Sequence, residues 1–192
     1  MASDLQQRIL LAATALFARQ GYTATAMREV AEAVGCTKPA LYYHFRSKEE
    51  LFLAAVQREM AHYNDLLQDI LKHTGPLRDR LKAGLDAHLD HVRTEPASMK
   101  LIMTAQHAPD TDGAPVIDML TMHAGNKRLI HALLEDGVRT GAIRAGLDLE
   151  KLSTSLIGLV NIWGMHCLLG QPVPDDISDH ILDIFFHGVA PS

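Results

Sequence analysis

The sequence predicts an all-α fold of about nine helices. Apolar residues recur at the three- and four-residue spacing of an amphipathic helix along most of the chain, and no segment shows the alternation typical of a β-strand. Glycine, proline and capping residues separate these periodic stretches, which is the pattern expected of helices joined by short connections.

The first two helices are predicted from an apolar stripe and from glycine stop signals. Residues 4–20 carry the stripe, and Gly21 follows in the position that commonly ends a helix. We expect Thr25 to cap a second helix that stops at Gly35.

Capping residues also define the third helix and the start of the fourth. We expect Thr37 to cap the third helix, with Pro39 in its first turn, where the missing N–H costs nothing. Ser47 and Glu50 match a capping box, with serine at the N-cap and glutamate at N3. The long helix that they open is expected to reach about His73.

The rest of the chain predicts five more helices. A Gly-Pro pair at residues 75–76 and turn-forming residues over 108–115, 141–146 and 171–174 mark the breaks between them. The expected helices cover 77–93, 96–107, 116–140, 149–170 (capped by Asp148) and a last segment led by Asp175 and Asp176.

Residues 1–47 meet the requirements of a helix-turn-helix. Ala31 is small where two helices would cross, Gly35 provides the turn, and Leu41 would anchor the second helix from within. That second helix would bury Leu41 and Phe45 and present a short polar and aromatic face, able to enter the major groove of DNA. The outward residues are Thr37, Lys38, Ala40, Tyr42, Tyr43 and His44.

Residues 21–56, GYTATAMREVAEAVGCTKPALYYHFRSKEELFLAAV, resemble the N-terminal signature of the TetR (tetracycline-repressor-like) family. The most specific part is LYYHF at residues 41–45 followed by KEEL at 48–51. The likeness covers about a quarter of the chain. It implies a sequence-specific DNA-binding transcriptional regulator that is not an enzyme, expected to be a repressor released from its operator by a ligand.

The resemblance also implies roles for single residues. Lys48 would grip a phosphate at a helix N-terminus, and Ala40 could offer only a methyl contact to a base. Met27 departs from the threonine or valine of many relatives. The implied DNA-binding residues are Arg28, Thr37, Lys38, Ala40, Tyr42, Tyr43, His44 and Lys48.

Three of these residues have a purely structural alternative. Tyr43 could be a core aromatic residue beside Phe45, and His44 could be an ordinary helix-surface residue. Arg28 could pair with Glu32 one helical turn away.

Residues 48–192 are expected to form a ligand-binding and dimerisation domain behind the DNA-binding domain of residues 1–47. The resemblance implies a homodimer through 149–169 and 176–187, with Gly158 and Gly164 allowing close approach. A two-fold dimer would place two reading helices about 34–36 Å apart on a near-palindromic operator of double-stranded DNA.

A small apolar or amphipathic effector is expected in the C-terminal domain, because methionine suits adaptable apolar pockets and histidine or tryptophan adds polar groups. Plain core packing of the methionines is the alternative. The candidate ligand-binding residues are Met60, His88, Met103, Met119, His123, Trp163, Met165 and Cys167.

Composition excludes several other classes. The net charge of −5 rules against a protein that wraps nucleic acid, but residues 1–52 hold six Lys/Arg and only five acidic residues, which fits DNA contact through one end. The chain lacks a membrane-length apolar run, a signal-peptide pattern and hydrolase or nucleotide-binding motifs, so a cytoplasmic protein without cofactors is expected. Its two cysteines, Cys36 and Cys167, lack metal-site spacing.

A histidine-rich metal-binding helical bundle, or a metal-responsive regulator, is the main alternative function. The chain has 11 histidines, and Glu59 and His62 form an E-x-x-H pair on a predicted helix. A di-iron bundle needs that pair twice together with two more glutamates, and the sequence has it once, so no metal site is predicted.

Overall fold

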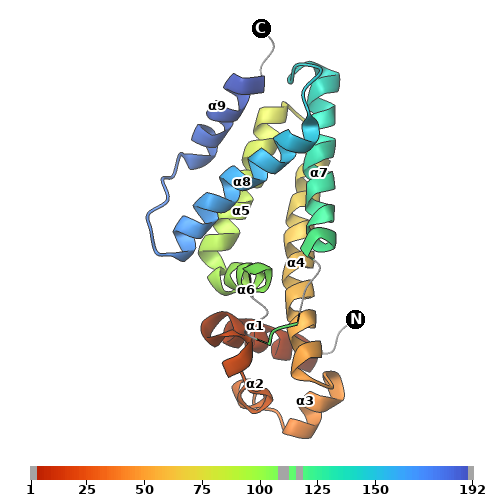
Figure 1. Ribbon diagram of the computed structural model, residues 1–192, viewed down its shortest axis with the longest axis vertical. Coiled ribbons are helices and arrows are strands. Elements are labelled where there is room, and N and C mark those ends of the chain that lie inside the picture. The colour runs from red at the N-terminus through yellow and green to blue at the C-terminus, as the bar shows by residue number, and fades with distance from the viewer. Residues whose placement is uncertain (1–3, 108–112, 116–118, 190–192) are drawn as a thin grey trace. The chain divides into compact units, whose positions relative to one another are not determined.

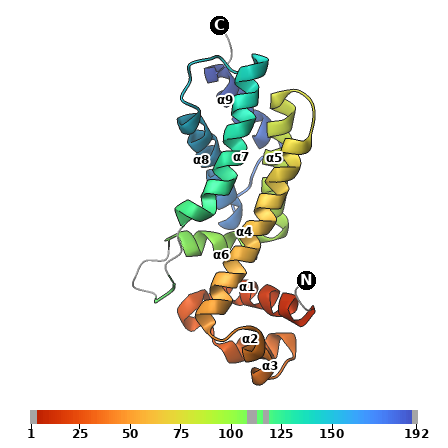
Figure 2. The same cartoon turned by 90° about the vertical axis from the view of Figure 1, so that its right-hand side faces the viewer.

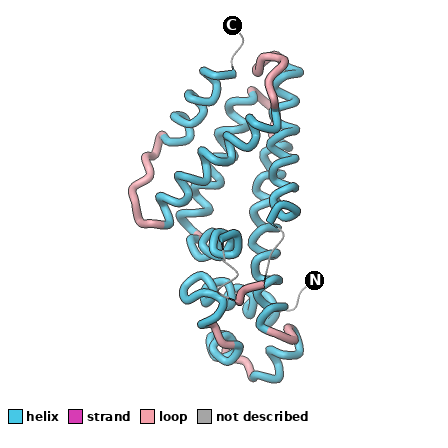
Figure 3. The backbone as a smooth tube through the Cα atoms, in the orientation of Figure 1, coloured by secondary structure: helices cyan, strands magenta, loops and turns pink. Residues whose placement is uncertain are grey.

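The computed structural model describes residues 4–107, 113–115 and 119–189, and every regular element in these ranges is a helix (Figures 1 and 3). The fold prediction is therefore confirmed. The nine helices of these described ranges are α1 (Asp4–Ala24), α2 (Met27–Val34), α3 (Lys38–His44), α4 (Lys48–Lys72), α5 (Leu77–Thr94), α6 (Pro96–His107), α7 (Met119–Thr140), α8 (Leu149–Leu168) and α9 (Ile177–Val189). None of the helices in the described part of the chain is long and apolar enough to cross a membrane.

The chain divides into two compact units. The first comprises Met1–His62 and Glu95–Met119, and thus holds α1, α2, α3, the first part of α4, and α6. The second comprises Tyr63–Thr94 and Leu120–Ser192, and holds the rest of α4 with α5, α7, α8 and α9. The functional boundary predicted after residue 47 stays a prediction.

Glycine conformation separates α1, α2 and α3 as predicted. Gly21 leaves the helical region with φ 80° and ψ 173° and breaks α1 before its last residues. Gly35 adopts the left-handed conformation (φ 68°, ψ 32°) and donates its N–H back to the last turn of α2. A positive φ is costly for residues with a Cβ atom, so these two positions favour glycine.

The predicted cap of α2 was wrong by one residue. Ala26 occupies the N-cap, and the Thr25 hydroxyl instead donates to the Gly21 carbonyl at 2.7 Å. Glu29 replaces the missing side-chain cap, since its Oε2 accepts from the Ala26 N–H at 2.9 Å and from Gln20 at 3.0 Å. The hydrogen bond from Ala26 lowers the pKa of Glu29 below its usual value.

The caps of α3, α4 and α8 are confirmed. Thr37 Oγ1 accepts from the Ala40 N–H at 3.3 Å, and Ser47 Oγ accepts from the Glu50 N–H at 3.0 Å. In a standard capping box the N3 carboxylate accepts from the N–H of the N-cap residue, here Ser47. The Glu50 carboxylate instead accepts from the N–H of the preceding residue, Arg46, at 2.7 Å. At α8, Asp148 accepts from the Lys151 N–H at 3.1 Å.

The core of the first unit is built from buried side chains of α1, α2, α3, α4 and α6. Phe17 and Phe52 meet edge to face with ring centroids 5.0 Å apart, and Tyr22 adds a second edge contact to Phe52 at 5.1 Å. Arg8 links α1 to α2, because its guanidinium donates to the Val34 carbonyl at the C-terminus of α2, 2.5 Å away. Ile9, Leu41 and Leu51 are fully buried in the same unit.

A buried carboxylate links three helices of the first unit. Glu59 on α4, only 1% exposed, accepts from Thr14 on α1 at 3.0 Å and from Ser98 on α6 at 2.6 Å. Arg58 supplies a third contact to the same carboxylate. Both carboxylate oxygens of Glu59 are therefore occupied, which argues against the E-x-x-H pair acting as a metal site.

The second unit packs α5 against α8 and α9. Figure 1 shows α8 crossing α5, and Figure 2 shows the same unit from the side, with α7 in front. Its core is mainly aliphatic, with Leu134, Ile143 and Leu182 almost fully buried. Arg80 on α5 pairs with Asp136 on α7 at 2.5 Å, and Arg78 on α5 pairs with Asp183 on α9 at 2.8 Å.

Candidate functional site

Helix α3 combines two buried anchors with an exposed face. Leu41 is 0% and Phe45 is 3% exposed, so this side of the segment is held in the core of the first unit. Tyr43 is 86% and Tyr42 40% exposed. The alternative that placed Tyr43 in the core beside Phe45 is wrong, because successive residues of a helix point about 100° apart and the core already holds Leu41 and Phe45.

The remaining polar groups of α3 lie on or beside the exposed face. Lys38 is exposed, with its ammonium 6.0 Å from the centre of the Tyr42 ring. His44 is half-buried and meets the Tyr43 ring edge to face at 5.4 Å. The capping bond uses one lone pair of the Thr37 hydroxyl and leaves its proton free to be donated.

Arg28, on the first turn of α2, forms the ion pair with Glu32 that the sequence offered as an alternative to a contact with DNA. Its Nε lies 3.4 Å from the Glu32 carboxylate, and both side chains are well exposed. An exposed ion pair of this kind contributes only about 0.3–0.5 kcal/mol, so the guanidinium can exchange Glu32 for a phosphate at little cost.

Lys48 has a structural task that the sequence did not reveal. Its ammonium donates to the Tyr22 carbonyl at 3.0 Å and to the Thr23 carbonyl at 3.2 Å, and lies 4.4 Å from the centre of the Tyr22 ring. These contacts fasten the end of α1 to the start of α4. One of the three ammonium protons remains for a phosphate.

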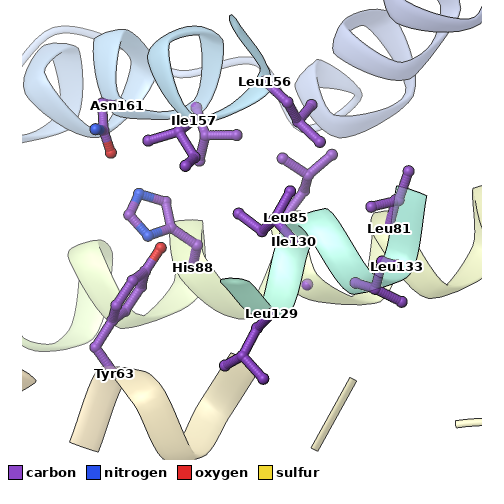
Figure 4. A pocket seen from close by; sticks show the side chains of 12 residues that line it. Tyr63, Leu81, Leu85, His88, Leu129, Ile130, Leu133, Leu156, Ile157 and Asn161 are labelled. Atoms are coloured by element: carbon purple, nitrogen blue, oxygen red, sulfur yellow. The ribbon is translucent and has the colours of Figure 1, made fainter. Parts of the chain in front are cut away.

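A cavity in the second unit lies between α4, α5, α7 and α8 (Figure 4). About 540 Å³ of space is free of protein atoms there, part of it open to solvent. The lining side chains are Tyr63, Leu81, Leu85, His88, Leu129, Ile130, Leu133, Leu156, Ile157, Val160 and Asn161, with Gly84 completing the wall.

His88 is the buried polar group of this cavity. It is 3% exposed, and neither ring nitrogen has a hydrogen-bond partner in the described part of the protein. Burial lowers the pKa of His88 to about 4, with a smaller contribution from the nearby His91. The imidazole is therefore neutral at physiological pH. The Tyr63 ring meets the His88 ring in an edge-to-face arrangement, with the ring centroids 5.3 Å apart.

The other predicted ligand residues lie elsewhere. Met60 is buried and Met103 half-buried in the first unit, whereas Trp163, Met165 and Cys167 are half-buried on α8 without lining the cavity. The side chains of Met119 and His123 lie outside the described residues. Of the eight residues, the structure places His88 at the cavity, and the others stay predictions.

Sequence reasoning missed Tyr63 and Asn161. Asn161 interrupts the apolar run of α8, and a polar residue within such a run was the signal that could have found it. Tyr63 gave no such signal, because a tyrosine at helical spacing is equally common at the surface.

A short helix with an exposed polar and aromatic face, anchored in a compact unit with α1, α2 and the start of α4, defines a helix-turn-helix DNA-binding regulator. The profile described as "Bacterial regulatory proteins, tetR family" matches residues 9–55, which include α2, α3 and both helix junctions. The chain belongs to the TetR family of DNA-binding transcriptional regulators.

Individual relatives support this assignment over most of the chain. The transcriptional activator FasR of Mycolicibacterium smegmatis is 32% identical over 155 residues, which cover 81% of this chain and 67% of FasR. The transcriptional repressor KstR2 of the same species is 28% identical over 155 residues, covering 78% of this chain and 72% of KstR2.

Among solved structures, a transcriptional regulator from Saccharomonospora viridis in complex with choline superposes with a TM-score of 0.82. It is 23% identical, and the match covers 100% of both chains. At this identity the similarity establishes the fold.

Proposed function

We propose that the protein is a transcriptional repressor that binds a near-palindromic operator as a homodimer and is released by a small apolar or amphipathic ligand. Because its target is chromosomal DNA, we expect it to act in the cytoplasm. The relatives do not decide the sign of regulation, since FasR is named an activator and KstR2 a repressor. Repression is the simpler mechanism, because occupancy of an operator is enough to exclude polymerase.

The observation that carries the DNA-binding role is the exposure of Tyr42, Tyr43 and Lys38 on a helix anchored by Leu41 and Phe45. Tyr43, at 86% exposure, contributes little to the packing of the unit that carries it. Lys38 and the tyrosine hydroxyls can donate to phosphates and base edges, which is what a reading helix needs.

A dimer through α8 and α9 is supported by apolar residues left on the surface of the second unit. Ile162 and Leu169 at α8 and Ile184 on α9 are each more than half exposed. A second copy of the chain would cover them from water, and a two-fold interface would pair the same patch on each subunit. Gly158 is open on its outer side and could admit a neighbouring helix.

The prediction that Gly164 serves the dimer was wrong. A Cβ atom at this position would lie 3.3 Å from His88 Nε2 and 3.7 Å from Val92, both on α5 of the same chain. The lack of a side chain at Gly164 therefore lets α8 approach α5 within one subunit.

Ligand release is supported by the apolar cavity between helices of the second unit. A ligand can weaken DNA binding only if it prefers the conformation that does not fit the operator. The choline complex shows that a protein of this fold can hold a small molecule. We infer that the cavity lined by His88 is the corresponding site here.

The proposal is tested by in vitro transcription from the promoter upstream of the protein's own coding sequence. We expect the protein to reduce transcript, and an apolar small-molecule library to contain compounds that restore it. Leu133→Trp, which fills the cavity wall, should keep repression but abolish the response. Increased transcript on adding the protein would reverse the assignment to activator, and a response that survives the tryptophan would move the ligand to another site.

A further inference from the structure

The polar groups of the cavity gather around one side chain. Figure 4 shows the Asn161 carboxamide and the Tyr63 hydroxyl both pointing toward the His88 ring. Leucine and isoleucine side chains, with Val160 and Gly84, form the rest of the wall. None of the described lining residues is aspartate, glutamate, lysine or arginine. A charged ligand group would therefore enter without a counter-charge, which is strongly unfavourable in an apolar site.

The His88 ring is a recognition group without a partner. Both its nitrogens are buried and form no hydrogen bond with the described part of the protein. A neutral imidazole has one N–H donor and one acceptor nitrogen, so it can pair with a hydroxyl, a carbonyl or an amide. Leaving such a group buried and unpaired is costly, which is why buried polar groups nearly always have a partner.

The low pKa of His88 argues against a ligand that binds this ring through a carboxylate. Because burial lowers the pKa of His88 to about 4, the ring carries no charge at neutral pH and offers no ion pair to a carboxylate. Nor does the wall contain a carboxylate to attract an ammonium group.

We propose that this cavity selects uncharged, largely apolar molecules that carry one hydrogen-bonding group, such as an alcohol, a ketone or an amide, and that the His88 imidazole recognises that group. The inference rests on the ligand site of the proposed function and specifies its chemistry. The apolar body would lie among Leu85, Leu129 and Ile157, with the polar group at the His88 end.

Three probes with the same hydrocarbon chain separate the possibilities: decanol, used below its aqueous solubility, and decanoate and decylammonium, each used below its critical micelle concentration. The chain has one tryptophan, Trp163, which packs against the core of the second unit on the same helix as Asn161. Its fluorescence and isothermal calorimetry give two independent measures of binding. We expect decanol to bind at least tenfold more tightly than either charged probe.

His88→Leu then tests the recognising residue. The leucine keeps the site apolar and removes an unpaired polar group, so the variant should fold with an unchanged or raised melting temperature. Decanol affinity should fall roughly five- to tenfold, the value of one hydrogen bond between neutral groups. His131→Leu, at a half-buried histidine on α7 outside the cavity wall, is the matched control and should leave the affinity unchanged.

The outcomes distinguish this inference from the proposed function. Equal or tighter binding of decanoate or decylammonium, or unchanged decanol affinity in His88→Leu, overturns the inference and leaves the ligand site standing. Failure of all three probes to bind overturns the inference and removes the support that the cavity gives to ligand release. Decanol that binds as expected but leaves the protein–DNA complex intact upholds the inference and contradicts release by occupancy of this cavity.

Discussion

The Glu59 carboxylate and the Ser98 hydroxyl are joined by a buried hydrogen bond of 2.6 Å, which links α4 to α6 inside the first unit. Thr14 holds the other carboxylate oxygen at 3.0 Å, so the same residue also links α4 to α1. Since α1 also packs with α2 of the helix-turn-helix, we expect this carboxylate to stabilise the helices that support the DNA-binding residues.

Replacing Ser98 with alanine should destabilise the protein by about 1–3 kcal/mol, because one oxygen of a buried carboxylate loses its donor. Urea unfolding followed by circular dichroism measures the change. Ser155→Ala, at an exposed position of α8, is the control and should change the free energy of unfolding by less than about 0.5 kcal/mol. Similar values for the two variants would show that the Glu59–Ser98 bond is not stabilising.

The turn of the helix-turn-helix gives a second prediction. Gly35 has φ 68°, and no atom lies within 4 Å of a Cβ placed there, so Gly35→Ala meets only backbone strain. We expect a loss of about 1–2 kcal/mol in unfolding free energy and weaker DNA binding. Gly35→Asn should lose less, because asparagine tolerates the left-handed region. Equal losses for both would indicate that conformation at this turn is not the cause.

Lys48 and Lys38 should differ although both lie at the DNA-binding head. Lys48→Met removes hydrogen bonds to the Tyr22 and Thr23 carbonyls and should lower the unfolding free energy by about 1 kcal/mol. Lys38→Met removes an exposed charge and should leave stability unchanged while reducing DNA affinity and the salt dependence of binding. Melting curves and binding isotherms at several salt concentrations measure both effects. Matching behaviour of the two variants would refute the structural role of Lys48.

The buried His88 predicts a specific pH dependence of stability. Its pKa is lowered to about 4 in the folded protein from an ordinary value of 6.5, so the unfolded chain binds the proton first as the pH falls. Stability is thus fully present above about pH 6.5, declines as the pH falls toward 4, and loses up to about 3 kcal/mol in this window.

His88→Leu should remove that part of the decline. The difference in unfolding free energy between wild type and variant, measured at a series of pH values, isolates His88 from the other titrating groups. A constant difference across the window would mean that His88 does not titrate as its burial indicates.

The fold was predictable because its signals are local. Gly21, Gly35, Thr37 and Ser47 act through their own backbone conformation or through hydrogen bonds a few residues away, and all four end or cap helices as predicted. The predicted cap at Thr25 was wrong because a threonine hydroxyl can form a hydrogen bond with backbone groups on either side of it. Here it donates to the Gly21 carbonyl and does not cap the start of α2.

The candidate site was also predictable only where it depends on positions within a single helix. The inward Leu41 and the outward Tyr42 follow from the helical repeat, but the contacts of Lys48 with residues 22 and 23 depend on how α1 meets α4. The cavity gathers Tyr63, His88 and Asn161 from three helices, and no spacing within one helix reveals such a meeting.

The most direct test of the account is the affinity of the purified protein for the DNA upstream of its own coding sequence, compared with a variant carrying Lys38→Ala, Tyr42→Ala and Tyr43→Ala. We expect a footprint with two half-sites one helical turn apart, and a loss of at least a hundredfold in affinity in the variant with an unchanged melting temperature. Lys100→Ala, an exposed lysine on α6, should bind as wild type does. Undiminished binding by the triple variant would contradict the claim that α3 reads DNA.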